Sequence, residues 1–385
     1  MRVGWMVRQL VDGCSVVVHA ARLAAIVKVV EGVIQGGRLS GATIGRNLPG
    51  SARPKHGIKC VDRLLGSSHF TRDRLFIFTA IAHHLLRGCP RPTILVDWTE
   101  AGGKHQALVA AVPIGGRALP IYLEVHGRKK VGNGAVEKRF LASLKAILPA
   151  ECRPVVVTDA GFKGPFFQAV LELSWDFLGR IRGTTKAFTP TGSVVSKDEL
   201  YARAELVPTA LGTFGLFIKQ PIPCSLVLVR GARKPGPKRP PPKRKQEREY
   251  RQGAIDPWLL ATSLPDPDPA HVVRLYAKRM QIEETFRDAK NHRFGWSLGD
   301  VKLSNPKRVA ALLVLASLAM VVVTLIGMAA EAQGTHRAYQ ANTERRRVLS
   351  FFVLAAAILR RADRSAVSEV AIQAALASVS VTASA

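Results

Sequence analysis

The spacing of apolar positions separates a helical first part of the chain from a mixed part that follows it. Over about the first 90 residues the apolar positions recur at helical spacing, and Gly and Pro mark the junctions. This pattern predicts short amphipathic helices over 16–33, 41–47, 57–65 and 72–86. The two middle helices and their basic connector have the size of a helix-turn-helix unit, although any helical bundle contains such pairs. We therefore expect a helical DNA-binding domain over residues 1–90.

After residue 90 the helical period gives way to apolar runs. Runs bounded by Gly or by charged turns predict strands, and the amphipathic stretches between them predict helices. The predicted strands cover 93–96, 106–113, 118–125, 154–159 and 175–182, and the predicted helices cover 134–148 and 163–173. The first three strands follow one another as a meander. This order predicts an α/β fold in which helices flank a mixed sheet.

Between residues 184 and 263 the pattern loosens, which predicts a β-rich insertion. Short strands are expected at 211–218, 224–230 and within 257–265. The run ARKPGPKRPPPKRKQ, at 232–246, is too polar and too rich in Pro for a core and predicts a basic loop. The core is then expected over 91–183 and 264–330, with one helix from about 269 to 290, and a C-terminal helical region over 331–385.

One apolar segment is long enough to cross a membrane. From Val309 to Met328 the chain has no charged residue. Basic residues flank it on both sides, at Lys307 and Arg308 and again at 345–347, so the charge asymmetry that orients a membrane span is missing. An all-round apolar helix is also typical of the core of a large domain. We expect a buried core helix and no membrane span.

The composition indicates a globular protein with a polyanionic partner. Of 385 residues, 56 are Lys or Arg and 28 are Asp or Glu, a net charge of +28, and 47% are hydrophobic, which excludes a disordered chain. Such an excess suits nucleic acid or an anionic membrane surface. The five cysteines are scattered, which supports neither a disulfide framework nor a zinc site. Charges among the first ten residues interrupt any secretory signal, so a cytoplasmic location is expected.

Three carboxylates stand out as candidates for chemistry. Asp97 and Asp159 each follow an apolar strand directly, and the carboxyl ends of strands hold the chemistry of open α/β sheets. Each could equally be a turn residue. The third is Glu283, on the helix from 269 to 290. On this helix Tyr276, Arg279, Glu283 and Lys290 share one stripe about 60° wide, although an exposed helix with Arg279–Glu283 ion pairs has the same spacing.

Three carboxylates without a Cys or His cluster are the ligand set of a hard cation such as Mg²⁺ or Mn²⁺. Two such ions can activate a water or a 3′ hydroxyl and stabilise the leaving oxygen in a phosphoryl displacement. This chemistry needs no side-chain nucleophile, which suits a sequence whose ten His are scattered.

The same residues resemble a family of bacterial insertion-sequence transposases with an Asp-Asp-Glu triad, the insertion-sequence-four family, and within it the transposon-ten transposase. The helix segment YAKRMQIEETFRDAK fits the family's Tyr-x2-Arg-x3-Glu-x6-Lys signature at every spacing. The similarity spans about residues 40–360. It is also carried by the segments LVDWTE, VTDAGFKGP, PWLLATSLP, RNLPGSARPKH, VDRLLG and QANT.

The resemblance implies a ribonuclease-H-like, retroviral-integrase-like core with the β-rich insertion between the second Asp and the Glu. Such enzymes cut their element out of DNA through a hairpin and join the freed 3′ hydroxyl to target DNA, as dimers in a synaptic complex. Two metal ions would then be held by Asp97, Asp159 and Glu283. Phosphates near the cleaved end would be held by Tyr276, Arg279 and Lys290. The DNA partners would be the terminal inverted repeats and the target, at the bacterial nucleoid.

Four further residues are candidates for contacts with DNA. A hairpin requires an unstacked base, which an aromatic face stabilises, and Trp98 and Trp258 are the candidates. Core packing is the alternative for both. Arg180 and Arg182 alternate on one predicted strand, so they face either the DNA channel or solvent.

Two other functions compete with a transposase. A DNA-binding regulator descended from a transposase would bind DNA without cutting it, but it has no physical reason to keep three carboxylates beside cations. A nuclease of the same fold acting on RNA–DNA hybrids or junctions would share the metal chemistry. It would not explain the helical first domain, the basic insertion or the spacing of Arg and Lys around Glu283.

Overall fold

The computed structural model describes residues 3–183, 185–217, 220–231, 255–292, 295–361 and 367–379. The predicted basic loop at 232–246 lies outside these residues. The chain forms two compact units: the first contains residues 1–154 and 280–385, and the second contains residues 155–279.

The first unit begins with helices, as the sequence predicted. They are α1 (Val3–Val11), which was not predicted, α2 (Ala20–Gly36), α3 (Gly41–Arg46), α4 (Pro54–Gly66) and α5 (Ser68–Leu86). Helix α4 begins at a proline, and the Ser67 hydroxyl caps α5 by accepting from the Phe70 amide. A Cβ added at Gly57 would overlap the carbonyl oxygen of Gly45, so these glycines allow the backbones of α3 and α4 to touch.

Three antiparallel strands follow the helices, which confirms the predicted meander. They are β1 (Thr93–Glu100), β2 (His105–Ile114) and β3 (Arg117–Gly127), with β2 between the other two. The prediction that β1 ends before Asp97 is wrong. Asp97 lies opposite Val109, and pairing continues to Glu100 opposite Gln106, so the ladder with β2 carries β1 past the carboxylate.

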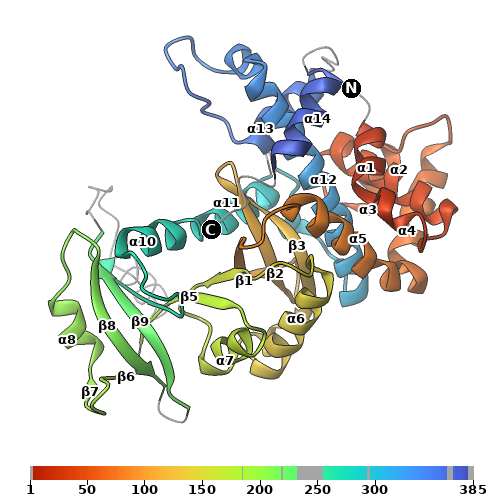
Figure 1. Ribbon diagram of the computed structural model, residues 1–385. Helices are drawn as coiled ribbons and strands as arrows, with labels where there is room; N and C mark the ends of the chain where they lie inside the picture. The colour runs from red at the N-terminus through yellow and green to blue at the C-terminus, as the bar shows by residue number, and fades with distance from the viewer. Residues whose placement is uncertain are drawn as a thin grey trace, which may run out of the picture. The chain divides into compact units, whose positions relative to one another are not determined.

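Helices cover both faces of these strands (Figure 1). On one face the Tyr122 ring packs against Phe78 of α5 and Phe140 of α6 (Gly134–Ile147), at centroid distances of 5.5 and 5.0 Å. On the other face α11 (Met280–Lys290) and α12 (Pro306–Ala332) pack on side chains of β1, β2 and β3, among them Thr99 and Val109. The strands therefore form the middle layer of the first unit.

Helix α12 confirms the predicted buried helix and extends it at both ends. Its length and composition would allow it to cross a membrane, but its most apolar 18-residue window is 100% buried in the protein. Asn305 caps it and Pro306 begins it. It packs against α2, β3, α13 (Phe351–Arg360) and α14 (Glu369–Ser378), which explains why it is apolar on every side.

The second unit is a mixed sheet with a β-rich extension (Figure 1). Its strand order is β4-β5-β10-β9-β8-β6-β7, with β4 parallel to β5 and the other described pairs antiparallel. The extension, β6 to β9 with α8, lies within residues 184–263, where the sequence predicted a β-rich insertion. The bounds are β4 (Val155–Thr158), α7 (Gly164–Glu172), β5 (Asp176–Arg180), β6 (Ala187–Phe188), β7 (Val194–Val195), α8 (Lys197–Ala202), β8 (Thr209–Leu216), β9 (Ile222–Val229), β10 (Trp258–Thr262) and α10 (Pro269–Ala277).

The single helix predicted over 269–290 is wrong. Helix α10 ends at Ala277 and α11 begins at Met280. At the break the amides of Lys278 and Arg279 bond to carbonyls three residues back, at 3.1 and 2.9 Å, which tightens the last turn of α10. Tyr276 and Arg279 are therefore not on the same helix as Glu283 and Lys290, and the continuous helical period that predicted a common stripe is interrupted.

Candidate active site

Helix α11 lies over the face of β1 that carries Asp97. The Lys290 ammonium donates to the Thr99 hydroxyl at 3.2 Å. Asp97 and Thr99 are two positions apart on one strand and so share a face. Glu283 lies two helical turns before Lys290, only about 20° around the helix from it. Within the first unit, Glu283 and Asp97 are thus half-buried side chains on facing sides of a helix and a strand.

The middle of α11 is attached to the edge of the sheet. The Thr285 hydroxyl is buried, accepts from the Ala118 amide of β3 at 2.7 Å, and donates to the Gln281 carbonyl at 2.9 Å. Such a bond to the free edge of β3 fixes both the height and the rotation of the helix. A rotation of α11 that moved Glu283 away from the strands would break this contact.

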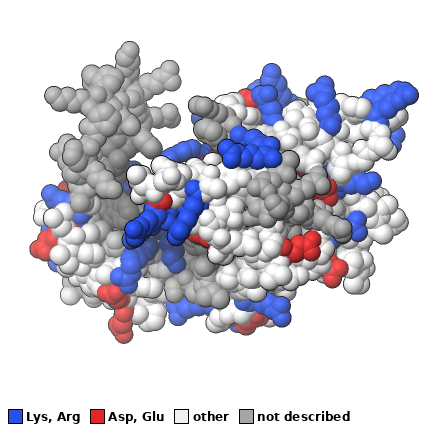
Figure 2. Space-filling view, turned by 90° about the horizontal axis from the view of Figure 1, so that it is seen from above, with Lys and Arg blue, Asp and Glu red and all other residues white. Residues whose placement is uncertain are grey.

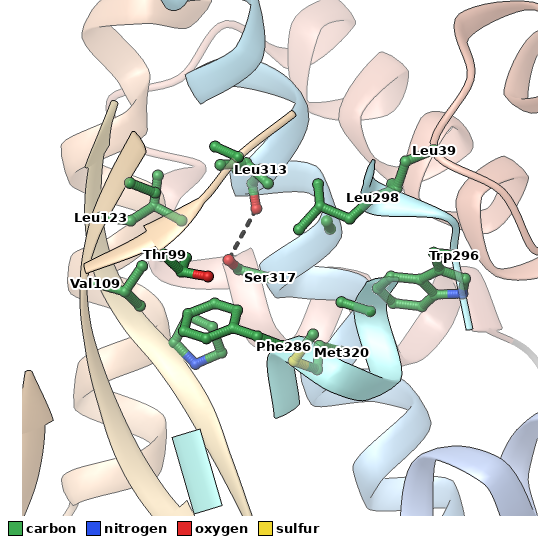
Figure 3. A pocket seen from close by; sticks show the side chains of 15 residues that line it. Leu39, Thr99, Val109, Leu123, Phe286, Trp296, Leu298, Leu313, Ser317 and Met320 are labelled. Carbon is green, nitrogen blue, oxygen red and sulfur yellow. Dashed lines mark hydrogen bonds between the residues drawn. The ribbon is translucent and has the colours of Figure 1, made fainter. Parts of the chain in front are cut away.

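A small cavity separates α11 and α12 from the strands (Figure 3). Its volume is about 30 Å³ and its walls are apolar apart from Thr99 and Ser317. The Ser317 hydroxyl already donates to the Leu313 carbonyl at 2.8 Å. The cavity is therefore a packing gap in the core beneath α11 and is too small for a substrate.

Asp159 belongs to the second unit and directly follows β4, as the sequence predicted. Its carboxylate accepts from the Gly161 amide at 2.8 Å, which closes a short turn at the end of the strand. A Cβ at residue 161 would lie 2.9 Å from the same carboxylate oxygen, so glycine leaves that oxygen open. The turn presents Asp159 half-buried at the carboxyl end of β4.

The first two signature residues also lie in the second unit. Tyr276 is buried, with its ring edge-on to Trp258 at 4.9 Å, and the Arg279 guanidinium carbon is 5.9 Å from the centre of the same ring. Burial raises the pKa of the Tyr276 phenol, and the nearby Asp159 charge raises it further against the opposing effect of Arg279 and Arg180. The phenol therefore stays protonated at neutral pH and can act as a hydrogen-bond donor.

Arg180 and Arg182 are bonded to the segment that enters β10. The Arg180 guanidinium donates to the carbonyls of Asp256 and Pro257, at 3.0 and 3.3 Å. Arg182 pairs with the Asp256 carboxylate at 3.5 Å. Burial lowers the pKa of Arg180. Both side chains thus hold the residues just before Trp258. No local sequence pattern indicates that these two arginines bind other parts of the protein.

Trp98 lies on the α6 side of the sheet, opposite to Asp97 and Thr99. Its indole N–H donates to Glu137 Oε1 of α6 at 3.1 Å, and its ring is edge-on to His126 at 5.7 Å. Glu137 is only 3% exposed. Sequence reasoning did not find this buried acceptor, because nothing local connects residues 39 positions apart.

A basic hollow of about 420 Å³ lies between the N-terminal helices and was also missed. Its lining includes Arg22, His56, Lys59 and Arg63, beside Cys60. The buried carboxylate of Asp73 pairs with Arg22 and orients it. The visible face of the molecule likewise carries far more Lys and Arg than Asp and Glu (Figure 2). Such a hollow can accept a phosphate group.

The donor chemistry of Asp97, Asp159 and Glu283 fits a hard divalent cation, because all three offer carboxylate oxygens. Asp97 and Glu283 belong to the first unit and Asp159 to the second. Within the residues that the structure describes, no three or more His, Cys, Asp or Glu side chains are grouped to hold a metal ion.

Comparison with known families identifies the class of protein. The family model described as a transposase DDE domain matches residues 88–322, which is more than half of the chain, so the protein belongs to this family. No curated protein matches the chain. The mixed α/β architecture is accordingly a ribonuclease-H-like DDE transposase fold. The family consists of DNA-binding nuclease and transferase enzymes of DNA recombination, which generally use divalent metal ions.

Proposed function

We propose that this protein is a cut-and-paste DNA transposase similar to the insertion-sequence-four family and, within it, to the transposon-ten transposase. It would cleave the ends of its element, through a hairpin intermediate, and join the freed 3′ hydroxyl to target DNA. The observation that carries the proposal is the placement of Glu283 and Lys290 on a helix fixed over the Asp97 face of β1. The transposase family and the full Tyr-Arg-Glu-Lys signature support the same reaction.

In this proposal Asp97, Asp159 and Glu283 are the catalytic residues and hold two Mg²⁺ ions, with Mn²⁺ as a substitute. Ions held there would activate the attacking water or 3′ hydroxyl and stabilise the leaving oxygen. The protein's own contribution is rigidity. Asp97 is fixed inside a paired strand, Asp159 in a closed turn, and Glu283 on a helix attached to the edge strand.

The cations and rings near these residues would hold the cleaved DNA end. Lys290, Arg279 and the neutral phenol of Tyr276 would bind phosphate oxygens. Trp258, whose neighbour is Tyr276, is the favoured face for an unstacked base, because the Trp98 indole is bonded to Glu137 on the opposite side of its sheet. Arg180 and Arg182 would act on DNA through the Asp256–Trp258 segment that they bind.

DNA recognition is assigned to the N-terminal helices, with the basic hollow as a phosphate contact. The terminal inverted repeats would bind over residues 1–90, and the core would occupy 91–183 and 264–330. The β-rich insertion, 184–263, and the C-terminal region, 331–385, complete the proposed division. We further propose a homodimer in the synaptic complex and action at the nucleoid in the cytoplasm, with no membrane attachment.

The experiment uses the purified full chain with a labelled duplex that ends in its element's own terminal repeats, in the presence of Mg²⁺ or Mn²⁺. The proposal predicts metal-dependent cleavage, a hairpin product at the element end and transfer of the 3′ end to a second duplex. Binding of the duplex without cleavage under any of these conditions would contradict it and favour a DNA-binding regulator.

A further inference from the structure

Asp288, on the same helix as Glu283, connects that helix to two distant parts of the first unit. Arg117, the first residue of β3, donates through Nε to Asp288 Oδ2 at 2.8 Å. The Ser350 hydroxyl, just before α13, donates to the same oxygen at 3.1 Å. The Asp288 side chain is 15% exposed and that of Arg117 is 23% exposed. A carboxylate so withdrawn from water is stabilised by these two donors.

The segment that supplies Ser350 is itself firmly held. Arg347 Nε donates to Glu331 of α12 at 3.0 Å, and its guanidinium carbon lies 3.9 Å from the centre of the Phe351 ring. A Cβ at Gly327 of α12 would lie 2.5 Å from the Phe351 carbonyl oxygen, so only glycine admits this approach. We name residues Arg347–Phe351 the C-terminal brace.

The brace and the strand edge together fix α11 along its length. Thr285 attaches the helix to the Ala118 amide of β3, and one turn later Asp288 attaches it to Arg117 and Ser350. Two attachments on one rigid helix prevent rotation as well as sliding. Because Glu283 and Lys290 lie on either side of these attachments, their positions over β1 depend on them.

We propose that Asp288 is a positioning residue and that the C-terminal brace holds Glu283 in its reactive position through it. This inference rests on the proposed function, in which Glu283 is catalytic. It gives the C-terminal region a role in the chemistry, since the brace lies beyond residues 88–322, which the family model matches.

The test compares Asp288→Asn, which removes the charge that Arg117 pairs with, and Ser350→Ala, which removes the hydroxyl donor. Ser350 also caps α13 by accepting from the Val353 amide, so Ser368→Ala, which removes the equivalent cap of α14, is the matched control. Glu284→Gln controls for charge loss on α11, because Glu284 pairs with Arg287 of the same helix and with neither Arg117 nor Ser350. Ser350→Thr keeps the hydroxyl and should behave like the wild type.

Two measurements are made: hydrogen exchange of the 280–290 backbone amides, and single-turnover cleavage with DNA saturating and Mg²⁺ varied. We expect faster exchange confined to α11 in Asp288→Asn and Ser350→Ala. Their cleavage should fall about 10- to 100-fold, with more Mg²⁺ needed and unchanged DNA affinity, as for residues that orient metal ligands. Ser368→Ala and Glu284→Gln should match the wild type in both measurements.

Unchanged exchange and unchanged cleavage in both Asp288→Asn and Ser350→Ala would overturn the inference, provided that the wild type cleaves and Glu283→Gln does not. If the wild type fails to cleave, or Glu283→Gln still cleaves, the proposed function has failed instead. In that case hydrogen exchange alone tests whether the brace fixes α11. Faster exchange of α11 in Asp288→Asn and Ser350→Ala supports it, and exchange at the wild-type rate overturns it.

Discussion

At the scale of single residues, cysteine reactivity gives a direct probe of the basic hollow. Cys60 is half-buried and lines the hollow, whereas the other four cysteines are buried. Burial raises the pKa of Cys14 and Cys152 to about 11 and of Cys224 to about 12. The thiolate reacts and the thiol does not. At pH 8 only about one in a thousand of the Cys14 and Cys152 side chains would therefore be in the reactive thiolate form.

We therefore predict that iodoacetamide labels Cys60 first in the native protein, and that duplex DNA slows this labelling. Cys14, Cys152 and Cys224 should become reactive only as the pH approaches their raised pKa values or the protein unfolds. Peptide mass spectrometry after timed labelling measures both effects. Labelling of Cys60 at the same rate with and without bound DNA would contradict a phosphate contact in the hollow.

Individual site residues differed in how well the sequence revealed them. Asp159 follows its strand as predicted, because a short apolar run followed by Asp and Gly specifies both the strand and its turn. Asp97 lies inside β1, because pairing with β2 determines where the strand ends. The sequence did not reveal Glu137, since its bond to Trp98 joins residues 39 positions apart.

At the scale of elements, the break between α10 and α11 shows what periodicity cannot reveal. No Gly or Pro lies between Tyr276 and Met280, so the sequence favours a continuous helix. In the structure α10 packs on strands of the second unit, and α11 is bonded to β3 and to the brace in the first. Tertiary contacts, which no local pattern encodes, divide the helix.

The buried helix α12 was predictable, and its packing makes a quantitative prediction. Leu318 is fully buried, so Leu318→Ala should lower the free energy of unfolding by about 2–5 kcal/mol through lost burial and a new cavity. Val370→Ala, at a side chain 75% exposed on α14, should change it by less than about 0.5 kcal/mol. Urea unfolding followed by circular dichroism measures both, and equal effects would contradict a core position for α12.

The salt dependence of DNA affinity distinguishes elements that contact DNA from elements that only support them. Lys59 is exposed on α4 beside the hollow, so Lys59→Ala should reduce the slope of log affinity against log salt by about 0.9, one phosphate contact. Arg180 donates to protein carbonyls, so Arg180→Ala should slow cleavage and leave that slope unchanged. Affinity measured across a salt series checks both. A reduced slope for Arg180→Ala would place its guanidinium on DNA.

At the scale of the whole molecule, charge and class were predictable and the division into units was not. The net charge of +28 and the signature spacing indicated a DNA-acting enzyme, and the family match agrees. The chain passes from the first compact unit to the second between residues 154 and 155, and it returns between residues 279 and 280. Neither position carries a linker composition, because the chain crosses between units next to regular strands and helices. Such crossings are set by packing and leave no compositional mark.

The catalytic role of Asp97, Asp159 and Glu283 is tested most directly by the single-turnover rate of element-end cleavage in Mg²⁺, with the protein already bound to DNA. The rate is measured for Asp97→Asn, Asp159→Asn and Glu283→Gln, with Glu284→Gln as the control. These substitutions keep side-chain size and remove one charge each. We predict that the three triad variants bind the duplex with wild-type affinity but do not cleave it, while Glu284→Gln cleaves at the wild-type rate. Cleavage that persists in any triad variant, or is lost equally in Glu284→Gln, would contradict it.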